Sequence, residues 1–320
     1  MTIFKAIILL ILGFVILIKS SNYFVDAISS IAANFKMSKM MIALTVAAFG
    51  TCTPELAISF NSMANAAGDI ALGNVFGSNI VNILLIVGFA ACINPIKVKD
   101  TAIKKEIPIL MLITLIFSIS ILFHLFGVTN SNVILNRQDG FLFIACFALF
   151  IFYIISVIRA KKGIFEQEKP KYGIFKSIII TIITCVLMIV SSDLVVDNAE
   201  VLATNLGIST KVITMCIVSI GTSLPEMVMT VAASRKGEFD IALGNIIGTN
   251  IFNIGVVLGL PILIYGGFQS ISFNIVDIFF VFLSTCILYF FSRSGKELSR
   301  LEGGIMITLF VIYYTYIFIV

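Results

Sequence analysis

Two glutamates lie inside strongly apolar stretches of the chain. Glu55 ends the motif Gly-Thr-Cys-Thr-Pro-Glu, and Glu226 ends the motif Gly-Thr-Ser-Leu-Pro-Glu. A charged side chain at the centre of a bilayer costs about 3 kcal/mol or more, so a carboxylate there indicates a functional site. The structural alternative is a pair with Lys, Arg or His. No basic residue lies deep in these stretches, and the single histidine, His124, is near the end of one. We therefore expect the partner to be a cation from solution.

Further oxygen-bearing side chains recur at helical spacing around the two acids. A hydroxyl four residues before each glutamate lies on the same helix face as the carboxylate. Two later stretches each carry a hydroxyl and an amide four residues apart. These residues are Thr51, Thr222, Ser78, Asn82, Thr249 and Asn253. Taken singly, such residues are as often explained by hydrogen bonds between helices, but their pairing around two acids favours ion binding.

Prolines next to the glutamates predict free backbone oxygens. Pro54 and Pro225 lack an N–H, so the carbonyls one turn earlier lose their helical partner. We expect these carbonyls around Gly50 and Gly221, with Ala48 and Ser219 as neighbouring candidates. Carboxylates, hydroxyls, amides and carbonyls suit Ca²⁺, which takes 6–8 oxygens, and also suit Na⁺. Transition metals would favour His or Cys, of which only Cys52 is available, and no cofactor is expected.

These residues must be positioned by membrane-spanning helices. The chain has 320 residues, of which 59% are hydrophobic and only 12% charged, which excludes a soluble globular protein. A helix needs about 20 apolar residues to cross the hydrocarbon core, because every backbone polar group must be bonded within it. The first apolar stretch has no small-residue cleavage pattern after it, so we expect a retained helix. Ten stretches qualify: 2–19, 40–64, 70–94, 107–126, 139–158, 174–190, 211–234, 241–264, 273–291 and 303–319.

The chain repeats itself at an offset of 171 residues. Residues 69–83 and 240–254 are identical at 11 of 15 positions, and the same offset relates the two glutamate motifs. We therefore expect two homologous halves, 1–158 and 174–320, joined by a short cytoplasmic linker, 159–173. Five spans separate equivalent points, and an odd number inverts the second copy relative to the membrane. Since inverted repeats are typical of secondary transporters, the predicted fold is an all-α membrane protein of ten spans, as two inverted five-helix repeats with broken helices at the ion site.

The distribution of Lys and Arg predicts the orientation. If the amino terminus lies outside, 18 of the 21 basic residues fall in inner loops, and only Lys5, Arg137 and Lys211 lie outside. Basic residues concentrate on the cytoplasmic side of membrane proteins. We therefore expect a multi-pass protein of the cell membrane with both termini extracytoplasmic. Apart from the lipid bilayer and the transported ions, we expect no nucleic acid and no obligate protein partner.

The doubled motifs resemble those of a known transporter family. Gly-Thr-x-x-Pro-Glu followed by Gly-Asn-x-x-Gly-(Ser/Thr)-Asn-x-x-Asn, present twice, is similar to the alpha-repeats of the cation/calcium antiporter superfamily, and the resemblance covers essentially the whole chain. Within it the chain is most similar to prokaryotic sodium/calcium exchangers, because the proton-coupled branch usually has Glu where Gly77 and Gly248 stand. The resemblance implies alternating access, in which one site binds either several Na⁺ or one Ca²⁺ and the protein switches only when occupied.

The resemblance also implies a role for each matching residue. The implied ligands are Glu55, Glu226, Thr51 and Thr222 for Ca²⁺; Asn82 and Asn253 for the middle of the site; the Ala48 carbonyl, Cys52 and Ser78 for Na⁺ on one side; and the Ser219 carbonyl, Ser223 and Thr249 for Na⁺ on the other.

Three of these positions depart from the family's pattern. Cys52 and Thr249 stand where the family has Ser, and Asn253 where close relatives have Asp. A thiol is a poor ligand for a hard alkali cation, so a coupling to H⁺ through a buried carboxyl stays open as an alternative. A dependence on K⁺ is also left open. A cation channel is a further alternative. An enzyme is not expected, since no span holds a nucleophile beside a His base or a pair of aspartates.

Overall fold

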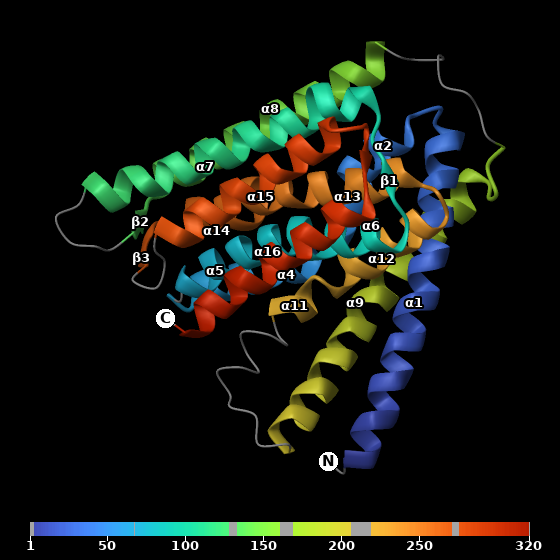
Figure 1. Ribbon diagram of the computed structural model, residues 1–320, viewed down its shortest axis with the longest axis horizontal. Coiled ribbons are helices and arrows are strands. Elements are labelled where there is room, and N and C mark those ends of the chain that lie inside the picture. Colours follow the sequence, from blue (N-terminus) through green and yellow to red (C-terminus); the bar gives the residue numbers. More distant parts are fainter. Residues whose placement is uncertain are drawn as a thin grey trace.

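The computed structural model describes residues 3–66, 68–127, 133–160, 169–205, 219–270 and 275–319, and most of them are helical (Figure 1). Seven helices in this part of the chain are long and apolar enough to cross a membrane, or eight if a pair bent at Cys52 counts as one span. The predicted all-helical membrane fold is thus confirmed. The count of ten spans stays a prediction, because the expected seventh span begins with residues 211–218, which lie outside the described residues.

The helices of residues 3–160 follow the expected order of spans. They are α1 (Ile3–Asn34) in the first; α2 (Lys39–Ile42), the π-helical η1 (Ala43–Ala47), α3 (Ala48–Thr51) and α4 (Thr53–Ala64) in the second; α5 (Gly68–Ile80), the π-helical η2 (Val81–Val87) and α6 (Gly88–Ile93) in the third; the π-helical η3 (Ala102–Glu106) and α7 (Ile107–Gly127) in the fourth; and α8 (Arg137–Ala160) in the fifth. π-helical turns are rare and occur frequently at functional sites, and η2 contains Asn82.

The described helices after residue 169 follow a similar order. They are α9 (Ile174–Asn205); α11 (Ser219–Thr222) and α12 (Leu224–Arg235); α13 (Phe239–Phe252), the π-helical η5 (Asn253–Leu258) and α14 (Gly259–Tyr265); α15 (Ile275–Arg293); and α16 (Arg300–Ile319). The segment η5 begins at Asn253, the repeat partner of Asn82, so both amides predicted to line the site lie in π-helical segments. Residues 161–168 of the predicted linker lie outside the described residues.

Two helices, α1 and α9, are much longer than predicted. Each has 32 residues, so the predicted ends at residues 19 and 190 are wrong. Polar residues after these points continue the helix because their side chains bond back to carbonyls one turn earlier, as Ser20 Oγ does to Ile16 O at 2.7 Å. Lys19 therefore lies inside α1 and not in an inner loop, which removes one residue from the charge count that predicted the orientation.

The helices α1 and α9 pack side by side in opposite directions. Figure 1 shows α1 rising from the amino terminus along α9, which descends to its end beside that terminus. The approach is close, since a Cβ on Gly13 would lie 2.8 Å from Val195 Cγ2. A helix of this length measures about 48 Å at 1.5 Å per residue, against about 30 Å for the hydrocarbon core. The pair must therefore tilt or extend beyond the core.

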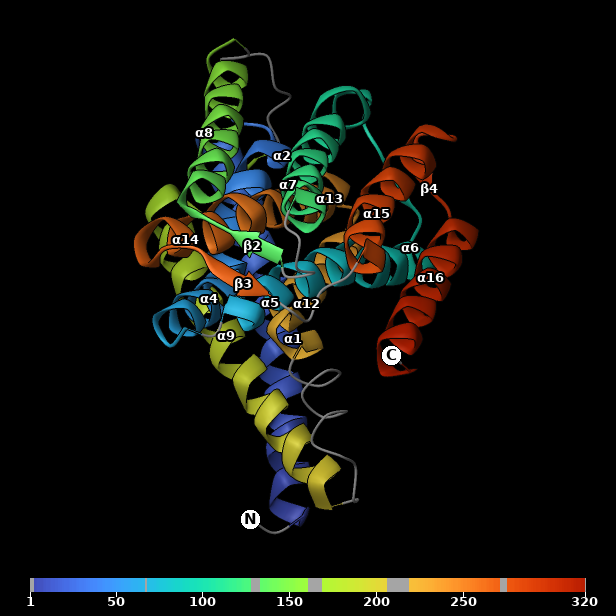
Figure 2. The same cartoon turned by 90° about the vertical axis from the view of Figure 1, so that its left-hand side faces the viewer.

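Outside this pair, the first and second parts of the chain interlock. The helix α8 packs on α14, and α16 packs on α6. Two short antiparallel ribbons also connect the two parts. In them β1 (Ile96–Lys97) pairs with β4 (Glu297–Leu298), and β2 (Val133–Leu135) pairs with β3 (Phe268–Ser270) (Figure 2). Beside the first ribbon, a hydrogen bond from the Lys296 ammonium lowers the pKa of Asp100. Elements of the two parts of the chain are therefore interleaved.

Candidate ion-binding site

Both glutamate motifs break their helices at equivalent positions. Between α3 and α4 the chain leaves helical geometry at Cys52 (φ −78°, ψ 4°), and between α11 and α12 it does so at Ser223 (φ −90°, ψ 10°). The cause is local, because Pro54 and Pro225 in the next turn cannot donate the hydrogen bond that would continue the preceding helix. The first break bends the span by 49°. The predicted broken helices are thus confirmed in the part of the chain that the structure describes.

Glu55 and Glu226 occupy the first turns of α4 and α12, where the positive end of the helix dipole favours a negative charge. Both are 0% exposed. None of their four carboxylate oxygens has a hydrogen-bond partner in the protein, and the two charges are close enough to repel each other. A buried charge without a partner is strongly destabilising. A cation bound between the two carboxylates would remove this cost.

Two other predicted ligands, Thr51 and Cys52, lie near this pair. Thr51 lies beside the Glu226 carboxylate, although too loosely for a full hydrogen bond, and Cys52 lies near both glutamates. The Cys52 thiol also approaches the Thr249 carbonyl at 4.0 Å. Residues of the first break therefore face helices of the second half. The buried oxygens without a partner include, besides those of the glutamates, Ser223 Oγ, Thr249 Oγ1, Asn82 Oδ1 and Asn253 Oδ1.

Ten of the twelve predicted ligand residues are buried: Ala48, Thr51, Cys52, Glu55, Ser78, Asn82, Ser223, Glu226, Thr249 and Asn253. Thr222 is half-buried, and Ser219 begins the described part of α11. These residues come from the two broken spans and from the two spans that contain η2 and η5, and those elements contact one another. The structure therefore places nearly all of the predicted set in the interior of the helical bundle.

The predicted release of backbone carbonyls is only partly correct. The Ala48 carbonyl is not free, because it accepts the Cys52 N–H at 3.0 Å. The Gly50 carbonyl accepts the Thr53 hydroxyl at 3.0 Å and the Cys185 thiol at 3.2 Å. The Gly221 carbonyl accepts the Ser192 hydroxyl at 2.8 Å. Neighbouring side chains thus replace the N–H that each proline removes, and the side-chain oxygens are the better candidate ligands.

Two asparagines that belong to the doubled motif, but were not predicted as ligands, contact the predicted ligands Asn82 and Asn253. Asn82 Nδ2 donates to Asn250 Oδ1 at 2.9 Å, and Asn253 Nδ2 donates to Asn79 Oδ1 at 3.1 Å. Asn79 and Asn250 are repeat partners within the segment that is most alike in the two halves, which was the available signal. Asn74, by contrast, donates from Nδ2 to the Glu55 backbone carbonyl at 3.1 Å and to the Ser59 hydroxyl at 3.3 Å, both within the first half of the chain.

Among the residues that the structure describes, three further acidic residues are buried near helix ends, but each has a protein partner. The Tyr153 hydroxyl donates to Glu106 at 2.6 Å, and the Tyr313 hydroxyl donates to Asp277 at 2.9 Å. Asp139 accepts the Ser120 hydroxyl at 2.5 Å and lies 3.0 Å from the His124 ring nitrogen. Burial alone therefore does not distinguish Glu55 and Glu226. The distinguishing feature is burial without a partner.

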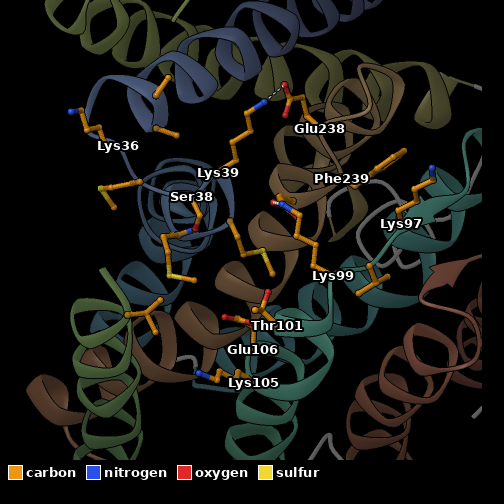
Figure 3. A pocket seen from close by; sticks show the side chains of 18 of the residues that line it. Lys36, Ser38, Lys39, Lys97, Lys99, Thr101, Lys105, Glu106, Glu238 and Phe239 are labelled. Atoms are coloured by element: carbon orange, nitrogen blue, oxygen red, sulfur yellow. Dashed lines mark hydrogen bonds and ion pairs between the residues drawn. The ribbon is translucent and has the colours of Figure 1, made fainter. Parts of the chain in front are cut away.

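A hollow of about 790 Å³ opens elsewhere, at the loops that were predicted to be cytoplasmic. Its rim carries five lysines, and two of them pair with acids across the halves, Lys39 with Glu238 at 2.8 Å and Lys99 with Asp240 at 2.6 Å (Figure 3). A surplus of positive charge repels cations. The hollow is therefore unsuited to bind them. The described residues also hold no group of three or more His, Cys, Asp or Glu side chains placed to bind one metal ion.

Comparison with known proteins points to one family. The pattern of the family described as "Sodium/calcium exchanger protein" matches residues 5–158 and 176–319. The chain is 37% identical to the putative antiporter CaxA of Alkalimonas amylolytica, over 96% of this chain and 97% of that one. It is 32% identical to the sodium/calcium exchanger MaX1 of Methanosarcina acetivorans, over 97% of each. A solved structure of the sodium-calcium exchanger NCX_Mj, soaked with Na⁺ and Sr²⁺, superposes with a TM-score of 0.82 at 29% identity, covering 98% of this chain and 99% of that one.

Proposed function

Because this chain belongs to the sodium/calcium exchanger family, we propose that it is an antiporter that exchanges Ca²⁺ for Na⁺ across the membrane by alternating access. Family membership makes it a membrane transporter and not an enzyme. The observation that carries the choice of ions is the set of four carboxylate oxygens, fully buried and without a protein partner, at two equivalent helix breaks. Two carboxylates match the charge of one Ca²⁺ or of two Na⁺.

The two unpaired carboxylates explain why transport is coupled. Two unpaired charges in a closed interior cost several kcal/mol each, so the protein avoids closing around an empty site. It can close when Ca²⁺ or Na⁺ neutralises Glu55 and Glu226. Each change of access therefore carries ions, and a return with the other ion produces exchange instead of leakage. A channel needs no such closed and neutralised state.

We assign the ligands as the family resemblance implies. Glu55 and Glu226 hold Ca²⁺ with the hydroxyls of Thr51 and Thr222, and Asn82 and Asn253 lie at the middle of the site. The Na⁺ ligands proposed are Cys52, Ser78 and the Ala48 carbonyl, which also accepts the Cys52 N–H, on one side, and the Ser219 carbonyl, Ser223 and Thr249 on the other. Burial of these side chains and the free oxygens of several of them support the assignment.

The architecture proposed is ten spans in two inverted halves, 1–158 and 174–320, with both termini extracytoplasmic. The opposite directions of α1 and α9 and the equivalent breaks at Cys52 and Ser223 support the two inverted halves, and the distribution of Lys and Arg supports the orientation of the termini. A single cysteine introduced at Lys171 would be labelled by an impermeant maleimide only from the cytoplasmic side. Labelling of that cysteine from outside intact cells would overturn the orientation.

A coupling to H⁺ is the second candidate, and Cys52 is the observation that favours it. Its buried thiol stands among the proposed Na⁺ ligands, beside the Thr249 carbonyl. Ca²⁺ uptake into proteoliposomes should be compared under an imposed Na⁺ gradient, H⁺ gradient, K⁺ gradient or none. Na⁺ coupling predicts uptake that requires the Na⁺ gradient. Uptake that follows the H⁺ gradient alone would replace Na⁺ with H⁺, and uptake that needs no countergradient would indicate a channel.

Replacing the thiol should change the Na⁺ requirement. A hydroxyl is a better ligand for a hard cation than a thiol, so Cys52→Ser should lower the Na⁺ concentration for half-maximal Ca²⁺ exchange by about threefold to tenfold, on the scale of one improved polar contact. The Ca²⁺ concentration for half-maximal exchange should change much less. Cys146→Ser provides the control, since that buried cysteine lies on α8. An equal shift in both variants would contradict the assignment of Cys52 to a Na⁺ site.

A further inference from the structure

Four buried asparagines, Asn79, Asn82, Asn250 and Asn253, form one hydrogen-bonded network that connects the two halves. Asn82 and Asn253 are the two predicted ligands among them, and the side-chain nitrogen of each donates a hydrogen bond to an asparagine of the opposite half. All four side chains are at most 2% exposed. The offset of 171 residues relates Asn79 to Asn250 and Asn82 to Asn253. The two hydrogen bonds are therefore one contact, repeated by the pseudo-symmetry of the chain.

The hydrogen-bonded network fixes where the ligand oxygens lie. A side-chain amide is planar, with its oxygen and nitrogen on opposite branches, so a bonded nitrogen determines the direction of the oxygen. In both Asn82 and Asn253 that oxygen is buried and has no partner. A buried acceptor left unpaired is destabilising, and a bound cation would satisfy it. The bond to the opposite half thus sets the position of an oxygen that is otherwise free to rotate.

We infer that Asn79 and Asn250 are positioning residues of the ion site, and this inference rests on the proposed function. Neither is assigned as an ion ligand. Asn79 holds the Asn253 amide, and Asn250 holds the Asn82 amide, so that each half orients a ligand supplied by the other. The two ligand oxygens reach the ion together only while the halves keep this register. Ca²⁺ affinity therefore depends on the packing between the halves as well as on the ligands themselves.

The two positioning residues are not held equally. Asn250 Nδ2 donates to the Asn79 backbone carbonyl at 3.2 Å, whereas Asn79 Nδ2 has no partner. An aspartate in place of either keeps the acceptor oxygen and removes the donor. Asn79→Asp therefore loses no hydrogen bond, while Asn250→Asp loses one. The added negative charge is the same at the two equivalent positions. The difference in Ca²⁺ affinity between the two variants therefore measures the contribution of the hydrogen-bonded network.

The test is a double-mutant cycle with equilibrium Ca²⁺ binding to the purified protein and Ca²⁺ exchange in proteoliposomes as readouts. Asn79→Ala should weaken Ca²⁺ binding by about tenfold, as expected for one buried hydrogen bond. The double variant Asn79→Ala with Asn253→Ala should bind no more weakly than Asn253→Ala alone, since Asn79 acts through Asn253. Likewise, the double variant Asn250→Ala with Asn82→Ala should bind Ca²⁺ no more weakly than Asn82→Ala alone. The losses of affinity in Asn79→Ala and Asn82→Ala, which belong to different pairs, should multiply when the two are combined.

A structural role alone would not produce this pairing between the halves. Asn61→Ala is the matched control, because it removes a similar amide bond, from Asn65 Nδ2 at 2.9 Å, on an exposed face. The inference would be overturned if the effects of the two substitutions multiplied in the pair Asn79 and Asn253 or in the pair Asn82 and Asn250. It would also be overturned if Asn79→Asp weakened Ca²⁺ binding as much as Asn250→Asp. If an alanine variant does not fold, the comparison of the two aspartate variants decides. Wild-type protein that neither binds nor exchanges Ca²⁺ would instead overturn the proposed function, and the inference with it.

Discussion

Glu55→Gln and Glu226→Gln should each lower Ca²⁺ exchange by at least about 100-fold. Each substitution keeps the shape of the side chain and removes one of the two charges that would neutralise Ca²⁺. Breaking a buried charge pair by removing one partner costs about 3–5 kcal/mol, and about 2.7 kcal/mol already corresponds to 100-fold. The loss should appear in Na⁺-driven Ca²⁺ flux in proteoliposomes and in equilibrium Ca²⁺ binding. It should not appear in the yield of folded protein, because a neutral amide is less costly to bury than an unpaired carboxylate.

The control for this pair is another buried carboxylate. Glu106 is 2% exposed and accepts the Tyr153 hydroxyl at 2.6 Å, and the amide oxygen of Glu106→Gln can accept the same bond. That variant should keep Ca²⁺ exchange within about threefold of wild type, since a single neutral hydrogen bond is worth about 1 kcal/mol. Full flux in Glu55→Gln or in Glu226→Gln would remove the carboxylate pair from the site.

Gly248→Ala should destabilise the protein strongly, because α13 packs at that point directly on the backbone of the second span. An added Cβ would lie 2.6 Å from the Leu44 carbonyl oxygen and 2.8 Å from Ala48 Cβ. Backbone atoms cannot swing aside as a side chain can, so the helices must separate. Overpacking of this kind costs about 1–3 kcal/mol, which lowers the midpoint of thermal unfolding by roughly 5 °C. Ca²⁺ exchange should fall as well, since Ala48 and Thr51 move with the displaced segment.

The repeat supplies the matched control for this substitution. Gly77 is the equivalent of Gly248, yet the nearest atom to an added Cβ there is the Tyr314 hydroxyl, at 4.0 Å. Gly77→Ala should therefore leave the unfolding midpoint unchanged or raise it, because alanine favours a helix over glycine by about 1 kcal/mol. Size-exclusion chromatography after heating in detergent would measure both variants. Equal losses in the two would show that the halves pack symmetrically, against the structure.

The sequence predicted the two features on which the account depends. An unpaired carboxylate in an apolar stretch and a proline one residue before it are local patterns. The first predicts a buried functional group and the second predicts a helix break, whatever the rest of the fold. Glu55 and Glu226 are accordingly buried, and the helices break at Cys52 and Ser223. The repeat then predicted that the two breaks would be equivalent, and their backbone angles are nearly the same.

Features that depend on contacts between the halves could not be predicted. The partners of Asn82 and Asn253 are residues of the opposite half, and no local spacing identifies them. The carbonyl of Gly50 was expected to be free, but the Cys185 thiol comes from a helix more than 120 residues later. The difference between Gly77 and Gly248 is likewise invisible in two motifs that match so closely. Side-chain chemistry was thus predictable, and its partners across the bundle were not.

The most direct test of the exchange mechanism is uphill transport. Proteoliposomes should be prepared with equal Ca²⁺ on both sides and loaded with Na⁺, then diluted into Na⁺-free buffer that contains the same Ca²⁺ and no H⁺ or K⁺ gradient. The account predicts that Ca²⁺ accumulates inside against its own gradient while Na⁺ leaves, and that Glu55→Gln abolishes the accumulation. Ca²⁺ that stays equal on the two sides in functional wild-type vesicles would contradict the coupling of Ca²⁺ to Na⁺ through the glutamate pair.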